Sequence, residues 1–327
     1  MKYRKFSDLG WNTSEIGLGC WQIGWCWGDV TENDARDLLK KSIDKGINFF
    51  DTSDTYGDGR SERFLAELIK STSEKIYVTT KLGRRIRGTT YPKGYKHEPM
   101  EEFIDRSLIN LGVECIDLLQ LHCPSMEIIS NKETYQIMDT FVKKGKIANY
   151  GVSVHTISDA MEAIKNPNVK SIQIVFNIFR QKPAEHFLAE AKKKNVAVIV
   201  RGPLASGLLT GEITKETKFA ENDHRNYNIK GEAFDVGDTF SGVNLDRGFE
   251  AIERLKKLLP DNYTLADLAL KWILMHDGVT VVIPGATHKL HVETNARASE
   301  LEDITSLLPQ INSIYEELIK AEVHDRW

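Results

Sequence analysis

Four side chains capable of acid–base chemistry lie at or near the ends of short apolar segments. Asp51 follows NFF, Lys81 follows VTT, His122 follows LLQL, and Tyr56 comes shortly after Asp51. Tyrosine ordinarily titrates near ~10, but a neighbouring ammonium favours the phenolate and lowers the pKa. A carboxylate beside that ammonium holds it in place. The phenol can then give a proton to a carbonyl oxygen while hydride arrives at the carbon.

Short β-rich segments alternate with amphipathic stretches along the chain, and this order predicts parallel βαβ units. A length of 327 residues is ordinary for one α/β barrel. We therefore expect an α/β protein, a (β/α)8 TIM barrel, with one domain over residues 1–327. The predicted strands are Ile16–Gly19, Asn48–Thr52, Ile76–Lys81, Ile116–His122, Tyr150–Val154, Ser171–Phe176, Ala197–Arg201 and Thr280–Ile283. The rival is a doubly wound sheet, but its usual G-x-G-x-x-G is replaced here by GLGCWQIG.

End signals predict the helices and the extensions of the barrel. Helices are expected from Thr31 to Gly46, from Ser61, from Pro99 to Gly112, near Pro183 and from Thr264. Residues 2–14 read as an N-terminal hairpin that closes the bottom of the barrel, and an extra C-terminal helix begins near Ile304. The long connections Arg84–His97 and Gly211–Val243 are expected to be functional or mobile.

Polar residues at the ends of the predicted strands would face one mouth of such a barrel, where catalytic groups belong. Besides the four residues above, these ends carry Ser153, Gln173 with Asn177, and Arg201. A single polar strand end is best explained as a group that meets solvent. A carboxylate, an amine and an imidazole at three successive ends indicate an active site instead.

The sequence resembles the aldo-keto reductases, and in particular the general aldo/keto reductases of bacteria. Their Asp, Tyr, Lys and His tetrad lies in segments similar to NFFDTSDTYG, VTTKLG and LLQLHCPS. The similarity extends to SEIGLGCWQIG, YGVSV, QIVFN, GPLASGLLTG and VVIPGATHKLHVETN. The resemblance implies an NAD(P)H-dependent oxidoreductase that reduces an aldehyde or ketone to an alcohol, or runs the reverse reaction. Tyr56 would be the general acid and base, with Asp51, Lys81 and His122 completing the catalytic set.

The same resemblance implies a cofactor site at the mouth. Ser153 and Gln173 would hold the nicotinamide carboxamide, and the loop around Pro203 would cover the pyrophosphate. The full set of implied cofactor residues is Trp21, Asp51, Ser153, Gln173, Arg201, Gly202, Pro203, Leu204, Ser206, Gly285, Thr287, Lys289, His291 and Asn295.

The sequence departs from the family pattern at three places. Val154 stands where the family usually has Asn, and Arg201 stands where an aromatic ring often stacks on the nicotinamide. A guanidinium can also stack on a ring, and the alternative is a surface arginine. Gly285 and His291 stand where several members have a phosphate-binding lysine and arginine, which leaves Thr287, His288 and Lys289 at a predicted helix start that favours anions. NADPH or NADP+ is the expected cofactor, with NADH as the alternative.

The substrate pocket is expected to contain Trp21, Trp25, Trp27, Tyr56 and His122, because aromatic residues follow the first strand at the mouth. Packing of Trp25 and Trp27 against the hairpin is an equally good interpretation. His288 and His291 could suggest a metal pair, but no third ligand is near them in the sequence, so no metal is expected.

Composition limits the partners. A net charge of −4, from 43 basic and 47 acidic residues, gives no reason to expect nucleic-acid or membrane binding. The chain begins without the apolar segment of a signal peptide, and its apolar runs are strand-sized. We expect a cytoplasmic monomer or weak homo-oligomer that acts on a small carbonyl or sugar-like substrate. The alternatives are a non-catalytic nicotinamide-binding regulatory subunit and, ranked last, an unrelated barrel hydrolase.

Overall fold

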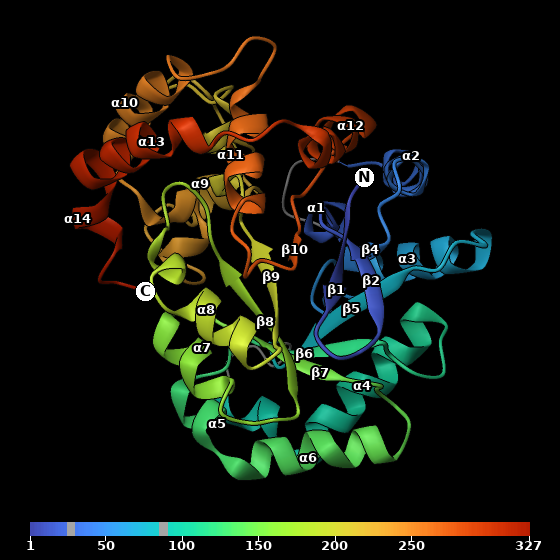
Figure 1. Cartoon of the computed structure of the whole chain (residues 1–327). Coiled ribbons are helices and arrows are strands. Elements are labelled where there is room, and N and C mark those ends of the chain that lie inside the picture. The colour runs from blue at the N-terminus through green and yellow to red at the C-terminus, as the bar shows by residue number, and fades with distance from the viewer. Residues whose placement is uncertain (25–29, 85–90) are drawn as a thin grey trace.

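The computed structural model describes residues 1–24, 30–84 and 91–327, and in this part of the chain eight parallel strands form the centre of the molecule with helices outside them (Figure 1). Trp25 and Trp27 lie outside the described residues. The strands are β3 (Leu18–Gly19), β4 (Phe49–Asp51), β5 (Tyr77–Leu82), β6 (Leu118–His122), β7 (Tyr150–Ser153), β8 (Val169–Val175), β9 (Ala197–Arg201) and β10 (Val281–Val282). All eight fall on the predicted segments.

The sheet is closed by contacts between its first and last strands. Each strand pairs with the next one along the chain from β3 to β10. Parallel bridges then join Ile16 to Val282 and Gly19 to Gly285, and Gly19 N donates to Pro284 O at 3.0 Å. The predicted (β/α)8 barrel is therefore confirmed.

The helices are set by caps and by one buried face. Thr31 and Thr264 form capping boxes with Asp34 and Asp267, as expected, and Gly112 ends its helix with a φ of 63°. The helices are α1 (Trp21–Gly24), α2 (Glu32–Asp44), α3 (Arg60–Ser71), α4 (His97–Leu111), α5 (Met126–Ser130), α6 (Lys132–Lys143), α7 (Ile157–Ala163), α8 (Phe187–Lys193), α9 (His224–Tyr227), α10 (Leu245–Lys256), α11 (Leu265–Leu274), α12 (Lys289–Arg297), α13 (Leu308–Ile314) and α14 (Lys320–Val323).

Two predicted helices, those near Pro183 and after Ile304, differ clearly from the structure. The helix expected from Ser61 begins one residue earlier, at Arg60, and the Ser61 hydroxyl donates to Cys20 O at 2.9 Å. Pro183 belongs to a 3-10 turn at Lys182–Ala184, and α8 begins only at Phe187. The single C-terminal helix expected from Ile304 is divided by a π-helical turn at Tyr315–Ile319.

The interior of the barrel is filled at the bottom by apolar side chains. Every second strand residue faces inward, and Phe49, Tyr77 and Leu118 form a cluster there with Phe6. Phe6 ends β1 (Tyr3–Phe6), which pairs with β2 (Trp11–Ser14) in the predicted hairpin. Its ring lies 5.5 Å from that of Phe49, so the hairpin closes this end.

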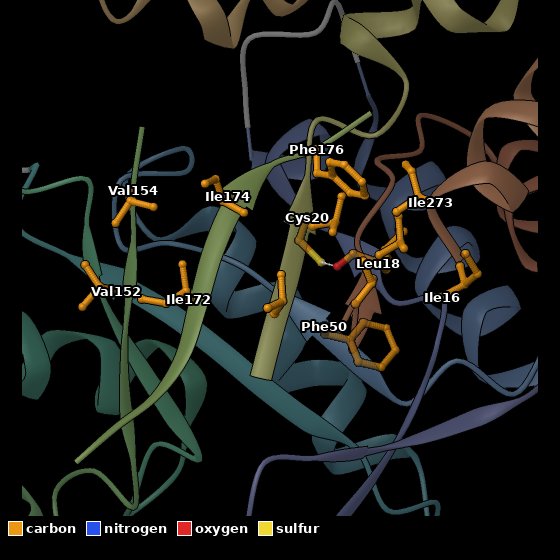
Figure 2. Close-up of a cluster of buried hydrophobic side chains, with 14 of the residues drawn as sticks. Ile16, Leu18, Cys20, Phe50, Val152, Val154, Ile172, Ile174, Phe176 and Ile273 are labelled. Atoms are coloured by element: carbon orange, nitrogen blue, oxygen red, sulfur yellow. Dashed lines mark hydrogen bonds between the residues drawn. The ribbon is translucent and has the colours of Figure 1, made fainter. Parts of the chain in front are cut away.

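A second apolar layer lies between the strands and the helices. Figure 2 shows part of it, where Ile172 and Ile174 of β8 lie near Val152 of β7, and Leu18 and Phe50 lie near Ile273 of α11. These residues alternate in sequence with the inward-facing ones. Among the described residues, no helix is long and apolar enough to cross a membrane.

Replacing Phe6 by alanine is expected to lower the free energy of unfolding by about 3–5 kcal/mol, because it leaves a cavity in the closed bottom of the barrel. Denaturant unfolding of Phe6→Ala and wild type measures the difference. Ile109→Ala is the matched control: Ile109 is 79% exposed and should change stability by less than about 0.5 kcal/mol. Equal stabilities of the two variants would contradict a structural role for the hairpin.

Candidate active site

The polar ends of the strands meet above the apolar bottom layer. The pairing register sets Asp51 opposite Gly19, and His122 opposite Ser153, which in turn lies opposite Gln173. Because inward positions alternate along each strand, these side chains and Arg201 enter the same mouth. They line a cleft of about 1990 Å³ together with Tyr56.

Lys81 connects the acid and the phenol. Its Nζ donates to Asp51 Oδ2 at 2.6 Å, to Thr52 O at 2.7 Å and to Tyr56 Oη at 3.3 Å. Lys81 is 1% exposed and Asp51 is 3% exposed, so the pair lies in a medium where charge interactions are strong. The predicted carboxylate, ammonium and phenol are therefore brought together in one hydrogen-bonded group.

Asp51 is held by more donors than the sequence suggested. Gln173 Nε2 donates to Asp51 Oδ1 at 2.6 Å, and Gln120 Nε2 donates to the same oxygen at 3.3 Å. Gln120 was missed, although it lies two residues before His122 on the same inward face of β6. These amides fix the carboxylate and, through it, the ammonium.

Burial and the neighbouring charges act on this group in opposite directions. Burial raises the pKa of the Tyr56 phenol above its ordinary value, while Lys81 opposes the rise. Lys81 therefore lowers this pKa, as expected, but in the cofactor-free protein burial has the larger effect. Burial would lower the pKa of Lys81, but Asp51 and Tyr56 hold it above its ordinary value. Lys81 is thus an ammonium, and Tyr56 is a protonated donor, at neutral pH.

His122 faces the phenol as a neutral imidazole. Its ring is perpendicular to that of Tyr56, with the centroids 6.2 Å apart. Burial and the positive charges of Arg84, Lys81 and Arg201 hold the pKa of His122 well below its ordinary value. A neutral imidazole donates a hydrogen bond from one ring nitrogen and accepts one at the other.

Aromatic residues of the long connection after β9 pack on Trp21, whose ring stacks on Tyr56. Trp21 stacks on Tyr56 with centroids 6.1 Å apart, and Phe234 meets the edge of Trp21 at 6.0 Å. The ring of the fully buried His224 lies 4.8 Å from Trp21. The sequence indicated that Gly211–Val243 is functional by its length but did not single out Phe234 or His224. Trp21 lines the cleft, as predicted for the pocket.

Arg201 is fixed in the wall of the cleft rather than exposed. It forms an ion pair with Asp238, donates to Val154 O at 3.0 Å, and its side chain is 17% exposed. The surface-arginine interpretation is wrong, because Asp238 and the carbonyl hold the guanidinium inward. Its Nε has no hydrogen-bond partner among the described residues. Val154 is fully buried and offers the cleft no side-chain donor.

A thiol beside His122 was also missed. Cys123 is 5% exposed, and its Sγ lies 3.4 Å from Ser153 Oγ and 3.9 Å from Arg201 Nη2. Burial would raise the pKa of this thiol, but His155, Arg84 and Arg201 lower it to about 6. Both His155 and Arg84 come just after strands, so the strand-end rule could have found them.

The predicted pyrophosphate loop forms one side of the cleft. Gly202, Pro203 and Leu204 all line it, and Gly202 has a φ of 60°, which glycine adopts without strain. Ser206 lines it as well, but its Oγ donates to Asp238 O at 3.2 Å and accepts from Phe240 N at 3.1 Å. Asn177 lies outside the cleft. Its Nδ2 donates to Gly202 O and to Ser241 Oγ, each at 2.8 Å.

The far end of the cleft lies at the start of α12. Thr287, His288, His291 and Asn295 line it, and the rings of His288 and His291 are 3.6 Å apart. Lys289 is exposed and is not among the lining residues, so the structure does not bring this predicted contact to the cleft. Among the described residues, no group of three or more His, Cys, Asp or Glu side chains could hold a metal ion.

Gly285 lines the cleft where Gln22 crosses it. A Cβ at Gly285 would lie 2.0 Å from Gln22 Nε2, so a larger residue cannot enter without moving the glutamine. Gln22 Oε1 is buried without a hydrogen-bond partner among the described residues. Asn295 Nδ2 donates to Gly285 O at 3.3 Å. This part of the cleft thus holds polar groups that a bound molecule could satisfy.

The donor set fits a dinucleotide. The cleft runs from Asp51, Tyr56 and His122 to the N-terminus of α12, and the positive end of a helix dipole favours anions. Between these ends lie the backbone of residues 202–206 and the unsatisfied atoms of Gln22 and Arg201. An elongated molecule with a polar ring at one end and phosphate at the other matches these groups.

Comparison with known proteins identifies the family of this chain. The chain is 28% identical over 330 residues to "Aldo-keto reductase YhdN" of Bacillus subtilis (strain 168), covering 99% of this chain and 96% of the relative. It is 27% identical over 318 residues to "Aldo-keto reductase yakc [NADP(+)]" of Schizosaccharomyces pombe, covering 94% and 89%. The solved structure of aldo-keto reductase AKR11C1 from Bacillus halodurans (holo form) matches with a TM-score of 0.77 and 27% identity, covering 100% and 99%. The aldo/keto reductase family model matches residues 15–316, and the chain therefore belongs to this family of oxidoreductases.

Proposed function

We propose that this protein is an NADPH-dependent carbonyl reductase that converts an aldehyde or ketone to an alcohol and can run the reverse reaction. The observation that carries the proposal is the contact of Lys81 Nζ with Asp51 Oδ2, at 2.6 Å, and with Tyr56 Oη, at 3.3 Å, because Asp51 and Tyr56 both line the cleft. This arrangement provides a phenol that can release a proton next to a fixed positive charge.

In the proposed mechanism a nicotinamide held by Ser153 and Gln173 would supply the hydride. Tyr56 Oη donates its proton to the carbonyl oxygen, and the Lys81 ammonium stabilises the phenolate that forms. His122 contacts the same oxygen and orients the carbonyl. Ser153 and Gln173 hold the carboxamide, and Trp21 limits the access of water to the reacting atoms.

A screen of aldehydes, ketones and alcohols with NADPH and NADH tests this function. We expect oxidation of NADPH by at least one aromatic aldehyde, and reduction of NADP+ by the matching alcohol at higher pH. Tight NADPH binding with no turnover of any probe would favour the regulatory-subunit alternative.

We further propose that the protein works in the cytoplasm, as a monomer or weak homo-oligomer, without nucleic-acid or membrane partners.

The 2′-phosphate is expected to bind at His288 and His291 on the cleft side of α12. The name of the S. pombe relative includes NADP(+), and a phosphate contact of this kind contributes on the order of 1.5–3 kcal/mol. His291→Ala should weaken NADPH binding about tenfold or more and leave NADH nearly unchanged. Titration of both cofactors by fluorescence quenching gives the two dissociation constants.

Lys289→Ala is the matched control, because Lys289 is exposed beside the same helix start but off the cleft. It should change NADPH binding far less than His291→Ala. Burial and His288 lower the pKa of His291, so the ring must gain a proton to pair with phosphate, and NADPH affinity should rise as the pH falls. Equal weakening of NADH and NADPH by His291→Ala would place the phosphate elsewhere.

A further inference from the structure

A buried polar chain lies behind His122, on the side of the ring away from Nε2. Ser53 Oγ is 3.2 Å from His122 Nδ1 and 3.2 Å from Asp54 Oδ1. It also lies 3.0 Å from Thr55 Oγ1 and accepts from Thr55 N at 3.3 Å. Ser53 and Asp54 are both fully buried, and His122 is 7% exposed. The chain thus connects the cleft to a carboxyl group that the mechanism above does not use.

The single proton of the Ser53 hydroxyl can serve only one of these neighbours at a time. If Ser53 donates to an ionised Asp54, its oxygen accepts from His122, which then carries its proton on Nδ1. If Asp54 is protonated, it can donate to Ser53, and Ser53 donates to Nδ1. The imidazole proton is then on Nε2.

Asp54 is surrounded so that its protonated form persists at neutral pH. Burial and the carboxylate of Glu62 on α3 raise the pKa of Asp54 to about 8, against the opposing effects of Ser53 and Arg106 on α4. Its backbone N donates to Lys81 O on β5 at 3.3 Å. Below about pH 8 the carboxyl group is therefore a hydrogen-bond donor.

His122 stays neutral across the same range. Charged or titratable groups that act on its ring include Arg84, Lys81, Arg201 and His155, and together with burial these four disfavour the imidazolium. A neutral ring has one N–H, so the position of that proton decides whether Nε2 donates or accepts.

We propose that Asp54 is a positioning residue that selects the tautomer of His122 through Ser53. Protonated Asp54 sets Nε2–H, which donates to a carbonyl oxygen and favours reduction. Ionised Asp54 sets Nδ1–H, so that Nε2 accepts from an alcohol hydroxyl and favours oxidation. In the change, the Asp54 proton passes to Ser53, the Ser53 proton passes to Nδ1, and the Nε2 proton leaves to water in the cleft. The effect on catalysis rests on the proposed function, while the tautomer change does not.

The direct test is the ¹⁵N spectrum of the histidine rings of the full-length, cofactor-free protein between about pH 6 and about pH 10. A His122→Gln variant identifies the His122 signals among the nine histidines. We expect Nε2–H at low pH and Nδ1–H at high pH, with the change near pH 8. Asp54→Asn cannot ionise, so the tautomer should no longer change with pH.

Kinetics with 4-nitrobenzaldehyde and NADPH give a second readout. In wild type, kcat/KM for reduction should fall above about pH 8. In Asp54→Asn this fall should move at least one pH unit higher, toward the range where Tyr56 ionises. Ser53→Ala should lower kcat about tenfold, the size of one neutral hydrogen bond, with the NADPH dissociation constant unchanged and no fall near pH 8.

Asp117→Asn is the matched control. Asp117 is a half-buried acid whose pKa burial also raises, but it lies near the start of β6, where it accepts from Val78 N at 3.0 Å. This variant should keep the wild-type tautomer change and pH profile. A single His122 tautomer across the pH range in wild type, or an unchanged transition in Asp54→Asn, would overturn the proposal. The expected spectra with no turnover of any probe would instead count against the proposed function alone.

Discussion

Turnover of Tyr56→Phe is expected to fall by at least about 10²-fold, the usual scale for loss of a general acid. The substitution removes the proton donor but hardly any volume, and the Trp21–Tyr56 stack at 6.1 Å keeps its ring. Cofactor affinity should therefore change little. Steady-state kinetics with the best carbonyl probe, together with NADPH titration, separate the two effects.

Tyr135→Phe is the control for this experiment. Tyr135 is a buried tyrosine on α6, outside the cleft lining, and its loss of a hydroxyl should leave kcat within about twofold. Turnover of Tyr56→Phe at the wild-type rate would remove Tyr56 from the mechanism and leave the family membership intact.

Lys81→Met should abolish most carbonyl reduction near neutral pH and also destabilise the fold. The phenolate formed from Tyr56 would lose the ammonium at 3.3 Å, so its pKa should rise further above the ordinary value. Alcohol oxidation, which needs the phenolate as base, should then begin only at higher pH than in wild type. The pH–rate profile of the residual activity measures this shift.

The stability effect of Lys81→Met follows from Asp51, which would remain buried without its ion-pair partner. Removing one member of a buried pair costs about 3–5 kcal/mol. Burial raises the pKa of Asp51, and loss of Lys81 raises it further. The destabilisation should therefore be largest at alkaline pH and shrink as the pH falls and Asp51 takes up a proton.

Denaturant unfolding at two pH values checks this sign. Lys271→Met is the comparison, since Lys271 is 8% exposed on α11 but has no carboxylate bound to its ammonium in the described contacts. It should cost less and show a weaker dependence on pH. An unchanged profile for alcohol oxidation in Lys81→Met would mean that Lys81 does not tune Tyr56.

The eight strands and the acid–base residues could be predicted because strand alternation and strand-end position act locally. An inward residue near the C-terminal end of a barrel strand enters the mouth whatever the helices do. Asp51, Lys81 and His122 are all of this kind, and the structure places them as the pattern indicates. Ser153 and Gln173 follow from the same rule.

The rest depends on contacts between segments far apart in sequence, which local patterns do not contain. Nothing near Arg201 in the sequence shows that Asp238 will hold it. The hydrogen bond from the Ser61 hydroxyl to the Cys20 carbonyl likewise joins two segments that the sequence pattern does not connect. Lys289 has the right charge for phosphate, but the helix turns it away from the cleft. The net direction of the Tyr56 pKa could not be predicted for a similar reason, because the depth of burial, which outweighs the lowering effect of Lys81, depends on the whole fold.

The closing seam of the barrel also has a consequence for how the protein is made. β3 ends at Gly19, and the residues that pair with its edge, Val282 and Gly285, come near the end of the chain. At a synthesis rate of ~5–20 residues per second, roughly 13 to 50 s pass between the synthesis of Gly19 and that of Gly285. During this time the ribosome carries an open sheet with unpaired N–H groups at Gly17 and Gly19, which closed barrels do not have. The mouth, whose far end is built from residues after Gly285, therefore forms only after these residues have been synthesised.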